Sequence, residues 1–331
     1  MPEDPALQVR GPLDDGEGLH DDWPDPPTGP VAAGDTNMSQ LPLEHLQAKF
    51  GALLDNKYNL PLKMHDIEKM EIPENFDSRE KWSNCQSIHQ VRDQSECGSC
   101  WAMGAVSAMS DRICIASEGR VQVSISAEDL LSCCKTCGHG CDGGYPQDAW
   151  DYWVNHGLVT GGEYESGEGC KPYPFPPCEH HTEGPRPQCG DIRPTPKCRH
   201  MCRKGYDTTY RHDKIYGKSA YSLPDDEKQI QMEILKNGPV EASFRVYDDF
   251  LVYKNGVYQT HLSTPSKFGH AIKILGWGTE NGTPYWLCAN SWNSDWGENG
   301  KKTRNLTIFN PLNHIIEYKI VIKYKNMNIK Q

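Results

Sequence analysis

Two cysteines three residues apart, Cys97 and Cys100, lie directly before an apolar run rich in small residues. The run begins at Trp101 and its apolar residues recur at helical spacing, which predicts a buried helix that begins near Cys100. Unpaired backbone N–H groups and the helix dipole at such an end stabilise negative charge, so a thiolate is favoured there. The stretch therefore predicts a nucleophilic cysteine at Cys100.

A nucleophilic thiol needs a base, because a pKa of about 8.5 leaves it mostly protonated at acidic to neutral pH. Of the 13 histidines, His270 opens a strand-like run from which a ring can project into a cleft. From spacing alone, a histidine exposed to water at a strand end is the simpler interpretation. The catalytic interpretation adds the amide of Asn290, beside Trp292, to orient the ring. It also adds Gln94 as an amide donor to an oxyanion.

Two kinds of secondary structure must position these groups. Helices are predicted after Cys100, after an N-cap at Ser126, from Pro146 to a stop at Gly157, and over residues 225–236. Strand-like runs cover residues 240–246, 250–258, 270–277 and 284–292. The pattern predicts an α+β protein with a helical lobe, a lobe built from an antiparallel sheet or barrel, and a cleft between them.

Length and charge exclude several classes of protein. The chain has 331 residues, enough for one large or two modest domains. Its formal charge is −11, and no basic field outside the last 31 residues suggests nucleic acid. No apolar run approaches the roughly 20 residues of a membrane-spanning helix. We expect a protein that neither binds nucleic acid nor inserts into a membrane.

Cysteine usage points to an oxidising compartment. All 14 cysteines lie between Cys85 and Cys288, a concentration typical of a disulfide framework. The first residues, however, have neither the basic nor the apolar region of a signal peptide. We interpret this conflict as a start of the chain that is incomplete or wrongly assigned.

Three segments outside the predicted lobes have a distinct composition. Residues 1–38 are rich in Pro, Gly and Asp, which predicts disorder. Leu43, Leu46 and Phe50 then recur at helical spacing, as in a short packing helix or in part of an inhibitory segment. Residues 170–202 contain five cysteines and eight prolines. They predict a long loop held by disulfides, and such loops are usually functional.

The order and local context of these motifs resemble the papain family of cysteine proteases. The similar motifs are Gln94, the C-G-S-C-W string around Cys100, Gly269-His270-Ala271 and Asn290-Ser291-Trp292. His270 and Asn290 follow Cys100 by 170 and 190 residues, whereas the family's gap is roughly 130–150 residues. The excess is close to the length of the 170–202 loop, which resembles the occluding loop of the cathepsin B-like branch. The resemblance covers roughly residues 40–300 and includes Cys141-Asp142-Gly143-Gly144.

The resemblance implies a papain-like two-lobe fold, with a helical left lobe and an antiparallel β-barrel right lobe. It implies a partial inhibitory propeptide over residues 39–71 and a peptidase domain over residues 72–300. Cys100 is then the nucleophile, His270 its base and later general acid, and Asn290 the residue that orients the imidazole. Gln94 forms the oxyanion hole with the Cys100 backbone N–H. The reaction is peptide-bond cleavage through a thioester, without metal or cofactor, and the cysteine pKa falls to about 3–4 in a thiolate–imidazolium pair.

The loop carries further expectations. The resemblance implies that His180 and His181 bind the C-terminal carboxylate of a substrate, so that the enzyme removes dipeptides from C-termini. His180–Asp93 and Arg186–Asp295 pin the loop, and its release admits longer chains for endopeptidase cleavage. The other substrate-binding residues are Gly143, Gly144 and Trp292. Zinc binding by the two histidines is the rival interpretation, although the cysteine pairs lack structural-zinc spacing.

Six disulfides are implied by the same resemblance, leaving Cys100 and Cys288 free. The pairs are Cys85–Cys114, Cys97–Cys141, Cys133–Cys198, Cys134–Cys137, Cys170–Cys202 and Cys178–Cys189. Protein and peptide substrates, cystatin-like inhibitors, a monomeric state and a lysosomal or secreted location are also implied.

The resemblance ends after Gly300. Twenty of the last 31 residues are Asn, Ile, Lys, Tyr or Phe, which A/T-rich codons specify. We interpret residues 301–331 as a divergent tail translated from an intron, so that the right lobe is incomplete at its C-terminus. The family's acidic residue in the pocket two positions before the scissile bond lies in the replaced segment. An inert truncated product is therefore the alternative to an active protease, and a zinc-binding non-enzyme module is a more distant one.

Overall fold

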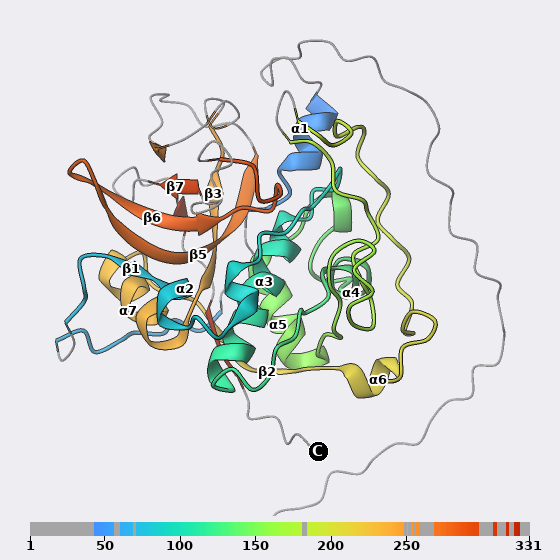
Figure 1. Cartoon of the computed structure of the whole chain (residues 1–331), viewed down its shortest axis with the longest axis horizontal. Helices are drawn as coiled ribbons and strands as arrows, with labels where there is room; N and C mark the ends of the chain where they lie inside the picture. The colour runs from blue at the N-terminus through green and yellow to red at the C-terminus, as the bar shows by residue number, and fades with distance from the viewer. Residues whose placement is uncertain are drawn as a thin grey trace, which may run out of the picture. The chain divides into compact units, whose positions relative to one another are not determined.

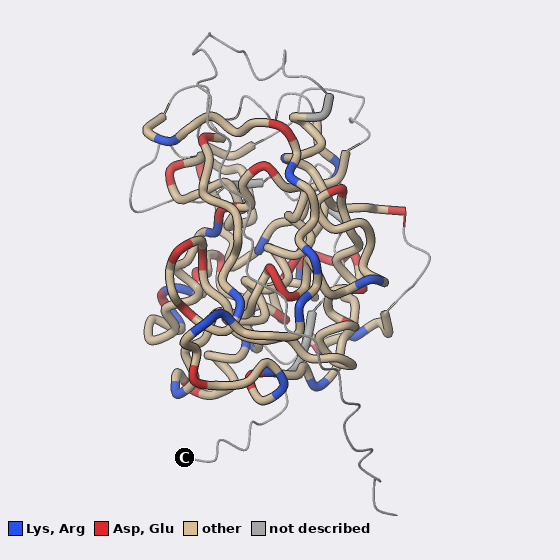
Figure 2. Tube along the Cα trace, turned by 90° about the vertical axis from the view of Figure 1, so that its right-hand side faces the viewer, with Lys and Arg blue, Asp and Glu red and all other residues tan. Residues whose placement is uncertain are grey.

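The computed structural model describes residues 43–55, 60–68, 71–180, 184–247, 250, 253, 256–258, 268–297, 307–309, 316–317 and 321–324. Residues 1–38, for which disorder is predicted, lie outside these ranges, as does His181. Among the described helices, none has the length and apolar character needed to cross a membrane. Figure 2 shows acidic and basic residues interspersed over the described chain.

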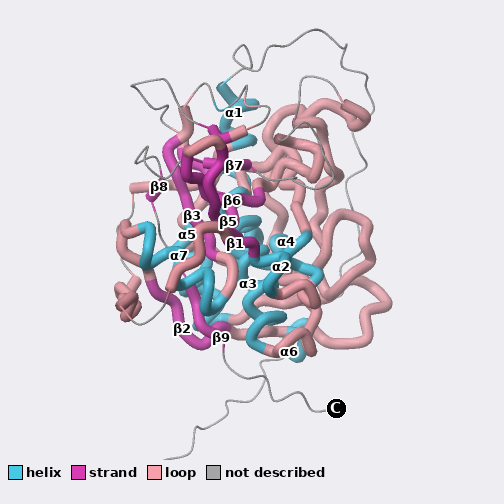
Figure 3. Tube along the Cα trace, turned by 60° about the vertical axis from the view of Figure 1, so that its left-hand side comes forward, coloured by secondary structure: helices cyan, strands magenta, loops and turns pink. Residues whose placement is uncertain are grey.

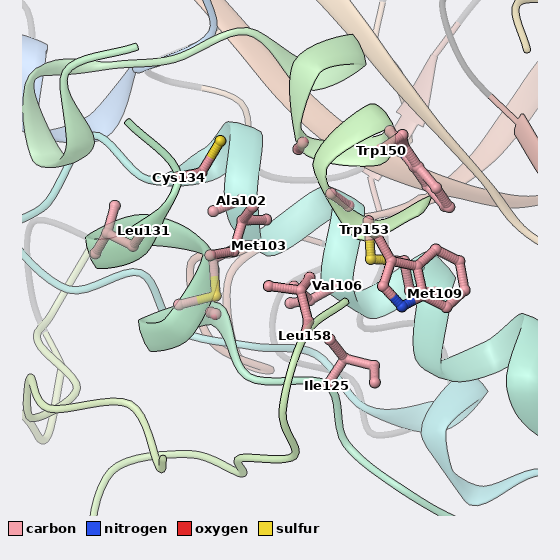
Figure 4. Close-up of a cluster of buried hydrophobic side chains, with 14 of the residues drawn as sticks. Ala102, Met103, Val106, Met109, Ile125, Leu131, Cys134, Trp150, Trp153 and Leu158 are labelled. Atoms are coloured by element: carbon pink, nitrogen blue, oxygen red, sulfur yellow. The ribbon is translucent and has the colours of Figure 1, made fainter. Parts of the chain in front are cut away.

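One lobe is built on the helix predicted after Cys100. This helix, α3 (Cys100–Ala116), is accompanied by α4 (Ala127–Cys133), α5 (Pro146–His156), α6 (Tyr210–Asp213) and the short 3-10 helices η2 (Gln86–His89) and η3 (Gly140–Asp142). Trp101, Met103, Val106 and Met109 of α3 pack with the α5 tryptophans in one buried core (Figure 4). Nearly the whole of α3 is buried, because other elements cover every side of it.

The helix ends follow the predicted signals. The Ser126 side chain accepts a hydrogen bond from the Asp129 amide at the start of α4. Pro146 is the first residue of α5, and Gly157 ends it at a φ of 68°, a conformation that glycine adopts without strain. In the second half, α7 (Glu227–Asn237) is capped by Asp226 before its first residue and by Gly238 after its last. The short helices α1 (Leu43–Lys49) and α2 (Ser78–Lys81) lie before α3 in the chain.

The second lobe is a mixed sheet. Its strands are β1 (Phe76–Asp77), β3 (Val240–Arg245), β4 (Val257–Tyr258), β5 (Gly269–Glu280), β6 (Thr283–Ala289), β7 (Thr307–Phe309) and β8 (Ile316–Glu317). The order is β4-β7-β6-β5-β3-β8, with β1 beside β5. All pairs are antiparallel except β4 with β7. Figure 3 shows the strands gathered in one region, and Figure 1 shows α3 against the sheet.

The expected antiparallel barrel is corrected to an open sheet. Its path ends at β4 and β8, which do not pair with each other in the described part of the chain. Closure needs hydrogen bonds between the two edge strands, and these short strands use theirs on β7 and β3. The rest of the fold class, a helical lobe beside a sheet lobe, is confirmed.

The divergent tail contributes strands. β7 lies between β4 and β6, β8 pairs with β3, and β9 (Val321–Tyr324) pairs with β2 (Gly217–Tyr221). The tail therefore covers sheet edges that the sequence predicted to be left unpaired. Its origin in an intron remains a prediction.

The long loop has no helix or strand between α5 and α6 among its described residues, only isolated bridges. The six disulfides are Cys85–Cys114, Cys97–Cys141, Cys133–Cys198, Cys134–Cys137, Cys170–Cys202 and Cys178–Cys189, the pairs that the resemblance implies. Cys100 and Cys288 are free and buried.

Candidate active site

Cys100 is the first residue of α3 and is fully buried. The chain before it is tied to the helical lobe by the Cys97–Cys141 disulfide and by the Gly98 amide, which donates to the Cys141 carbonyl at 2.8 Å. Trp101 Nε1 donates to the Gly140 carbonyl at 3.1 Å. These contacts fix the helix end and so place the thiol at the boundary between the lobes.

His270 is the second residue of β5 and is also fully buried, which rules out the solvent-exposed interpretation. One ring nitrogen, Nε2, lies 2.7 Å from Asn290 Oδ1. The same oxygen accepts a hydrogen bond from the Ser291 amide at 2.8 Å, so it acts as an acceptor and Nε2 carries the proton. Nδ1 has no hydrogen-bond partner among the described residues. It is therefore the nitrogen that can accept a proton.

The sheet brings these groups to Cys100. Pairing of β5 with β6 extends to Lys273 and Ala289, which leaves Asn290 just beyond β6 and near the start of β5. Ala271, next to His270, packs with Cys100 in one small apolar cluster. Trp292 lies 5.0 Å from the His270 ring, centroid to centroid, and shields the ring from water.

Gln94 is buried in the loop before α3. Its Nε2 donates to the carbonyls of Cys97 at 3.0 Å, Lys49 at 3.1 Å and Ala48 at 3.2 Å. Its Oε1 accepts from Ser291 Oγ at 2.6 Å, which fixes the amide orientation. A side-chain amide donor is thus held in the site, and two of its three acceptors belong to the segment before the peptidase domain.

That segment covers the site. The Gly51 amide donates to Cys100 Sγ at 3.2 Å, and the Ala52 amide donates to the Gly269 carbonyl at 3.1 Å. Gly144 exchanges hydrogen bonds of 2.8 and 2.9 Å with the backbone of Gly51 and Leu53. A Cβ added at Gly51 would lie 1.7 Å from a backbone oxygen of Gly98, so only glycine fits here. In Figure 1, α1 lies at the boundary between the sheet and the helices.

Burial has opposite effects on the two catalytic candidates. It raises the pKa of Cys100 to about 11, although hydrogen bonds from the Gly51 and Ala271 amides act in the other direction. It lowers the pKa of His270 to about 4, against the effect of the Asn290 hydrogen bond. Both shifts run against the expected thiolate–imidazolium pair with a cysteine pKa of about 3–4, which stays a prediction for the uncovered enzyme. Burial favours the neutral form of each group.

The predicted loop pins lie within contact distance. His180 Nε2 is 3.0 Å from Asp93 Oδ1, and both are nearly inaccessible to solvent. Both terminal nitrogens of Arg186 donate to Asp295 Oδ2 at 2.8 Å, in a more exposed pair. The His180 ring stacks on Trp292 at 5.8 Å.

Sequence reasoning missed Lys49. This lysine is buried, and its Nζ lies 3.4 Å from His180 Nδ1 and 5.5 Å from the Trp292 ring centroid. Burial lowers its pKa to about 8, while Asp93, Glu179 and Glu96 act to raise it. The available signal was a lone lysine between apolar residues at the end of a short helix.

The zinc interpretation of the loop is disfavoured by its sulfur chemistry. Two groups in the described residues place sulfur near imidazole: Cys133, Cys198 and His200, and Cys178, His180 and Cys189. All four cysteines are in disulfides, and zinc binds the thiolate form of cysteine.

A cysteine at a helix N-terminus and a histidine oriented by an amide, held between a helical lobe and a sheet, are typical of a cysteine protease of papain-like fold. A model of the family described as papain family cysteine protease matches residues 72–304. The chain belongs to this family.

Similar proteins agree on the branch. The chain is 59% identical over 237 residues to a cathepsin B-like cysteine proteinase of Schistosoma japonicum, covering 71% of this chain and 69% of that protein. It is 53% identical over 267 residues to cathepsin B-like cysteine proteinase 6 of Caenorhabditis elegans, covering 78% and 70%. Among solved structures, procathepsin B S9 from Trypanosoma congolense matches with a TM-score of 0.71 and 35% identity, covering 85% of this chain and 88% of that one.

Proposed function

We propose that the chain is the latent form of a peptidase that cleaves within polypeptides and also removes dipeptides from C-termini. The observation that carries the proposal is the convergence of Cys100, His270, Asn290 and Gln94 beneath the backbone of residues 51–53. The backbone of this segment lies over the site, which supports an extended peptide as the substrate.

Cys100, His270 and Gln94 take part in the reaction steps, while Asn290 orients the His270 ring. His270 Nδ1 takes the proton of Cys100, and the sulfur attacks the scissile carbonyl carbon. Gln94 Nε2 and the Cys100 backbone N–H stabilise the oxyanion. The intermediate collapses when His270 returns its proton to the departing amine, which leaves a thioester. Water, deprotonated by His270, then attacks the thioester carbon and releases the acid and the thiol.

Removal of dipeptides depends on the loop. His180, held by Asp93, and the adjacent His181 offer imidazole donors to a terminal carboxylate. A loop that closes one end of the cleft limits how much of the chain can extend past the scissile bond. Opening the two pins admits longer chains.

Latency follows from the segment that covers the thiol. Cys100 Sγ accepts a hydrogen bond from the Gly51 amide, so the segment presents a donor to the sulfur at this point. We assign residues 39–71 as a partial inhibitory propeptide on this basis. The disulfides favour a secretory route and a lysosomal or secreted location, and cystatin-like proteins are the expected inhibitors.

A paired substrate assay tests the specificity after residues 39–71 are removed. Two fluorogenic peptides differ only in a free or amidated C-terminus. We expect the free acid to be cleaved to a dipeptide more efficiently, and His180→Ala to reduce that preference. His200→Ala, at an exposed histidine of the same loop, is the matched control. Equal cleavage of both peptides would refute dipeptide removal, and cleavage of neither would favour the inert product.

A further inference from the structure

Residues 60–65 make a second set of peptide-like contacts, outside the cleft. The Ser222 amide donates to the Pro61 carbonyl and the Lys63 amide donates to the Ser222 carbonyl, both at 2.9 Å. In the first turn of α7, Gln229 forms two hydrogen bonds with the backbone of His65. Its Oε1 accepts from the His65 amide at 2.6 Å and its Nε2 donates to the His65 carbonyl at 3.0 Å. The backbone is thus held at three alternate residues, Pro61, Lys63 and His65.

The side chains of this segment alternate as they do in a strand. Leu62 and Met64 are each 62% exposed, so they face solvent. Lys63 and His65 face the protein, and both meet one carboxylate oxygen. Lys63 Nζ lies 2.9 Å and His65 Nε2 lies 2.6 Å from Glu233 Oε2.

Glu233 is prepared for these contacts by the peptidase domain. Its side chain is fully buried, and its other oxygen, Oε1, accepts from Arg112 at 3.0 Å and from Tyr221 and Asn237 at 2.9 Å. Burial acts to raise its pKa, but His65, Arg112 and Lys63 hold that pKa well below the usual range. One oxygen is therefore committed within the domain, and the second is directed at the segment. A carboxylate buried this deeply is costly unless cations meet it.

We propose that Ser222, Gln229 and Glu233 form a peptide-binding site separate from the catalytic cleft. The site recognises an extended strand with a lysine and, two residues later, a histidine, and its occupant in this chain is the segment 61–65. Backbone binding and side-chain selection depend on different residues. Ser222 and Gln229 hold the backbone of any extended peptide, whereas Glu233 selects cationic side chains at alternate positions. The inference goes beyond the proposed function and does not depend on catalysis.

Binding in trans tests the site. The full chain carries Cys100→Ala, which prevents cleavage, and the probe is a fluorescent nonapeptide with the sequence of residues 60–68. In this background, Lys63→Met with His65→Gln removes both cations that meet Glu233 and so weakens binding of the internal segment; this variant is called the disarmed chain. The matched control is Leu62→Ala with Met64→Ala, which changes the two solvent-facing side chains.

We expect the disarmed chain to bind the probe at least tenfold more tightly than the unchanged chain or the control. The reason is that an intact internal segment competes at a high effective concentration. Adding Gln229→Ala should weaken probe binding about tenfold, as should lysine-to-methionine replacement in the probe. No binding to the disarmed chain, or equal binding to all three chains, overturns the proposal.

Folding and function are controlled separately. Gln229→Ala spares the contacts of Glu233 with Arg112, so it tests the site where Glu233→Gln could unfold the domain. Circular dichroism and a count of the six disulfides show whether each variant is folded. Lys63→Arg keeps the positive charge, so it should leave the internal segment bound. Because Cys100 is absent from every chain, an inactive enzyme and a missing peptide site give different results.

Discussion

At the scale of single residues, burial favours the uncharged form of both the nucleophile and its base. Cys100 has a pKa of about 11 and His270 a pKa of about 4, and in both cases burial is the largest cause. Burial therefore works against the thiolate that the reaction needs. The covering segment thus acts on the chemistry as well as on access.

Acid should weaken the covered state. The His270 pKa is lowered from its ordinary 6.5 to about 4, so the uncovered form binds a proton that the covered form does not. Above pH 6.5 the covered state keeps its full stability relative to the uncovered state. As the pH falls toward 4, it loses about 3 kcal/mol of this stability. Deuterium exchange of residues 48–55 in the full chain should therefore accelerate over this interval. An unchanged exchange rate between pH 6.5 and 4 would contradict the account.

The two amides should have separable effects on the activated enzyme. Gln94→Ala removes an oxyanion donor and should lower kcat about 100- to 1,000-fold with little change in KM. Asn290→Ala releases the His270 ring and should lower kcat about 100-fold through misplacement. Steady-state kinetics on one peptide substrate measures both. Ser291→Ala removes only the hydroxyl that steadies Gln94, so a larger loss there than for Gln94→Ala would argue against the oxyanion role.

At the scale of elements, the loop pins differ in environment and so in expected strength. The Arg186–Asp295 pair is partly exposed, and exposed pairs contribute about 0.2–1 kcal/mol. The His180–Asp93 pair is almost fully buried, where loss of one partner is more costly. The His180–Asp93 pair should therefore contribute more than the Arg186–Asp295 pair to holding the loop closed.

Asp93→Asn should open the loop more than Arg186→Ala. We expect cleavage of an amidated long peptide to rise in both variants, more strongly in Asp93→Asn, while dipeptide removal falls. Arg203→Ala is a control because it changes an exposed arginine whose side chain donates to the Gly167 and Gly169 carbonyls. Equal effects of the two pins, or none, would refute the difference in strength.

At the scale of the whole molecule, much of the site followed from the sequence. The chemistry of a cysteine at a helix end was enough to select Cys100, whereas Gln94 and Asn290 were named only as partners of a catalytic His270. His270 needed the family motif, since spacing alone favoured an exposed ring. Lys49 was missed because its burial is created by the cleft that the segment enters. The open sheet was missed because edge pairing depends on contacts distant in sequence.

The two lobes are joined by an ion pair whose loss should be costly. Lys273 of β5 lies 2.8 Å from Asp111 of α3, and both are buried. Lys273→Met should destabilise the oxidised full chain by about 3–5 kcal/mol, because an unpaired carboxylate remains buried. Adding Asp111→Leu should restore part of that loss. Urea unfolding measures both, and a double variant less stable than Lys273→Met would contradict the pairing.

The most direct test of the account is the reactivity of the two free thiols in the full chain and after removal of residues 39–71. A peptidyl epoxide and mass spectrometry report Cys100, while the buried Cys288 reports loss of fold. We predict little labelling of either cysteine in the full chain. After removal, Cys100 alone should be labelled rapidly, and His270→Ala should suppress that labelling. Rapid labelling of Cys100 in the full chain, or none after removal from a folded protein, would contradict the account.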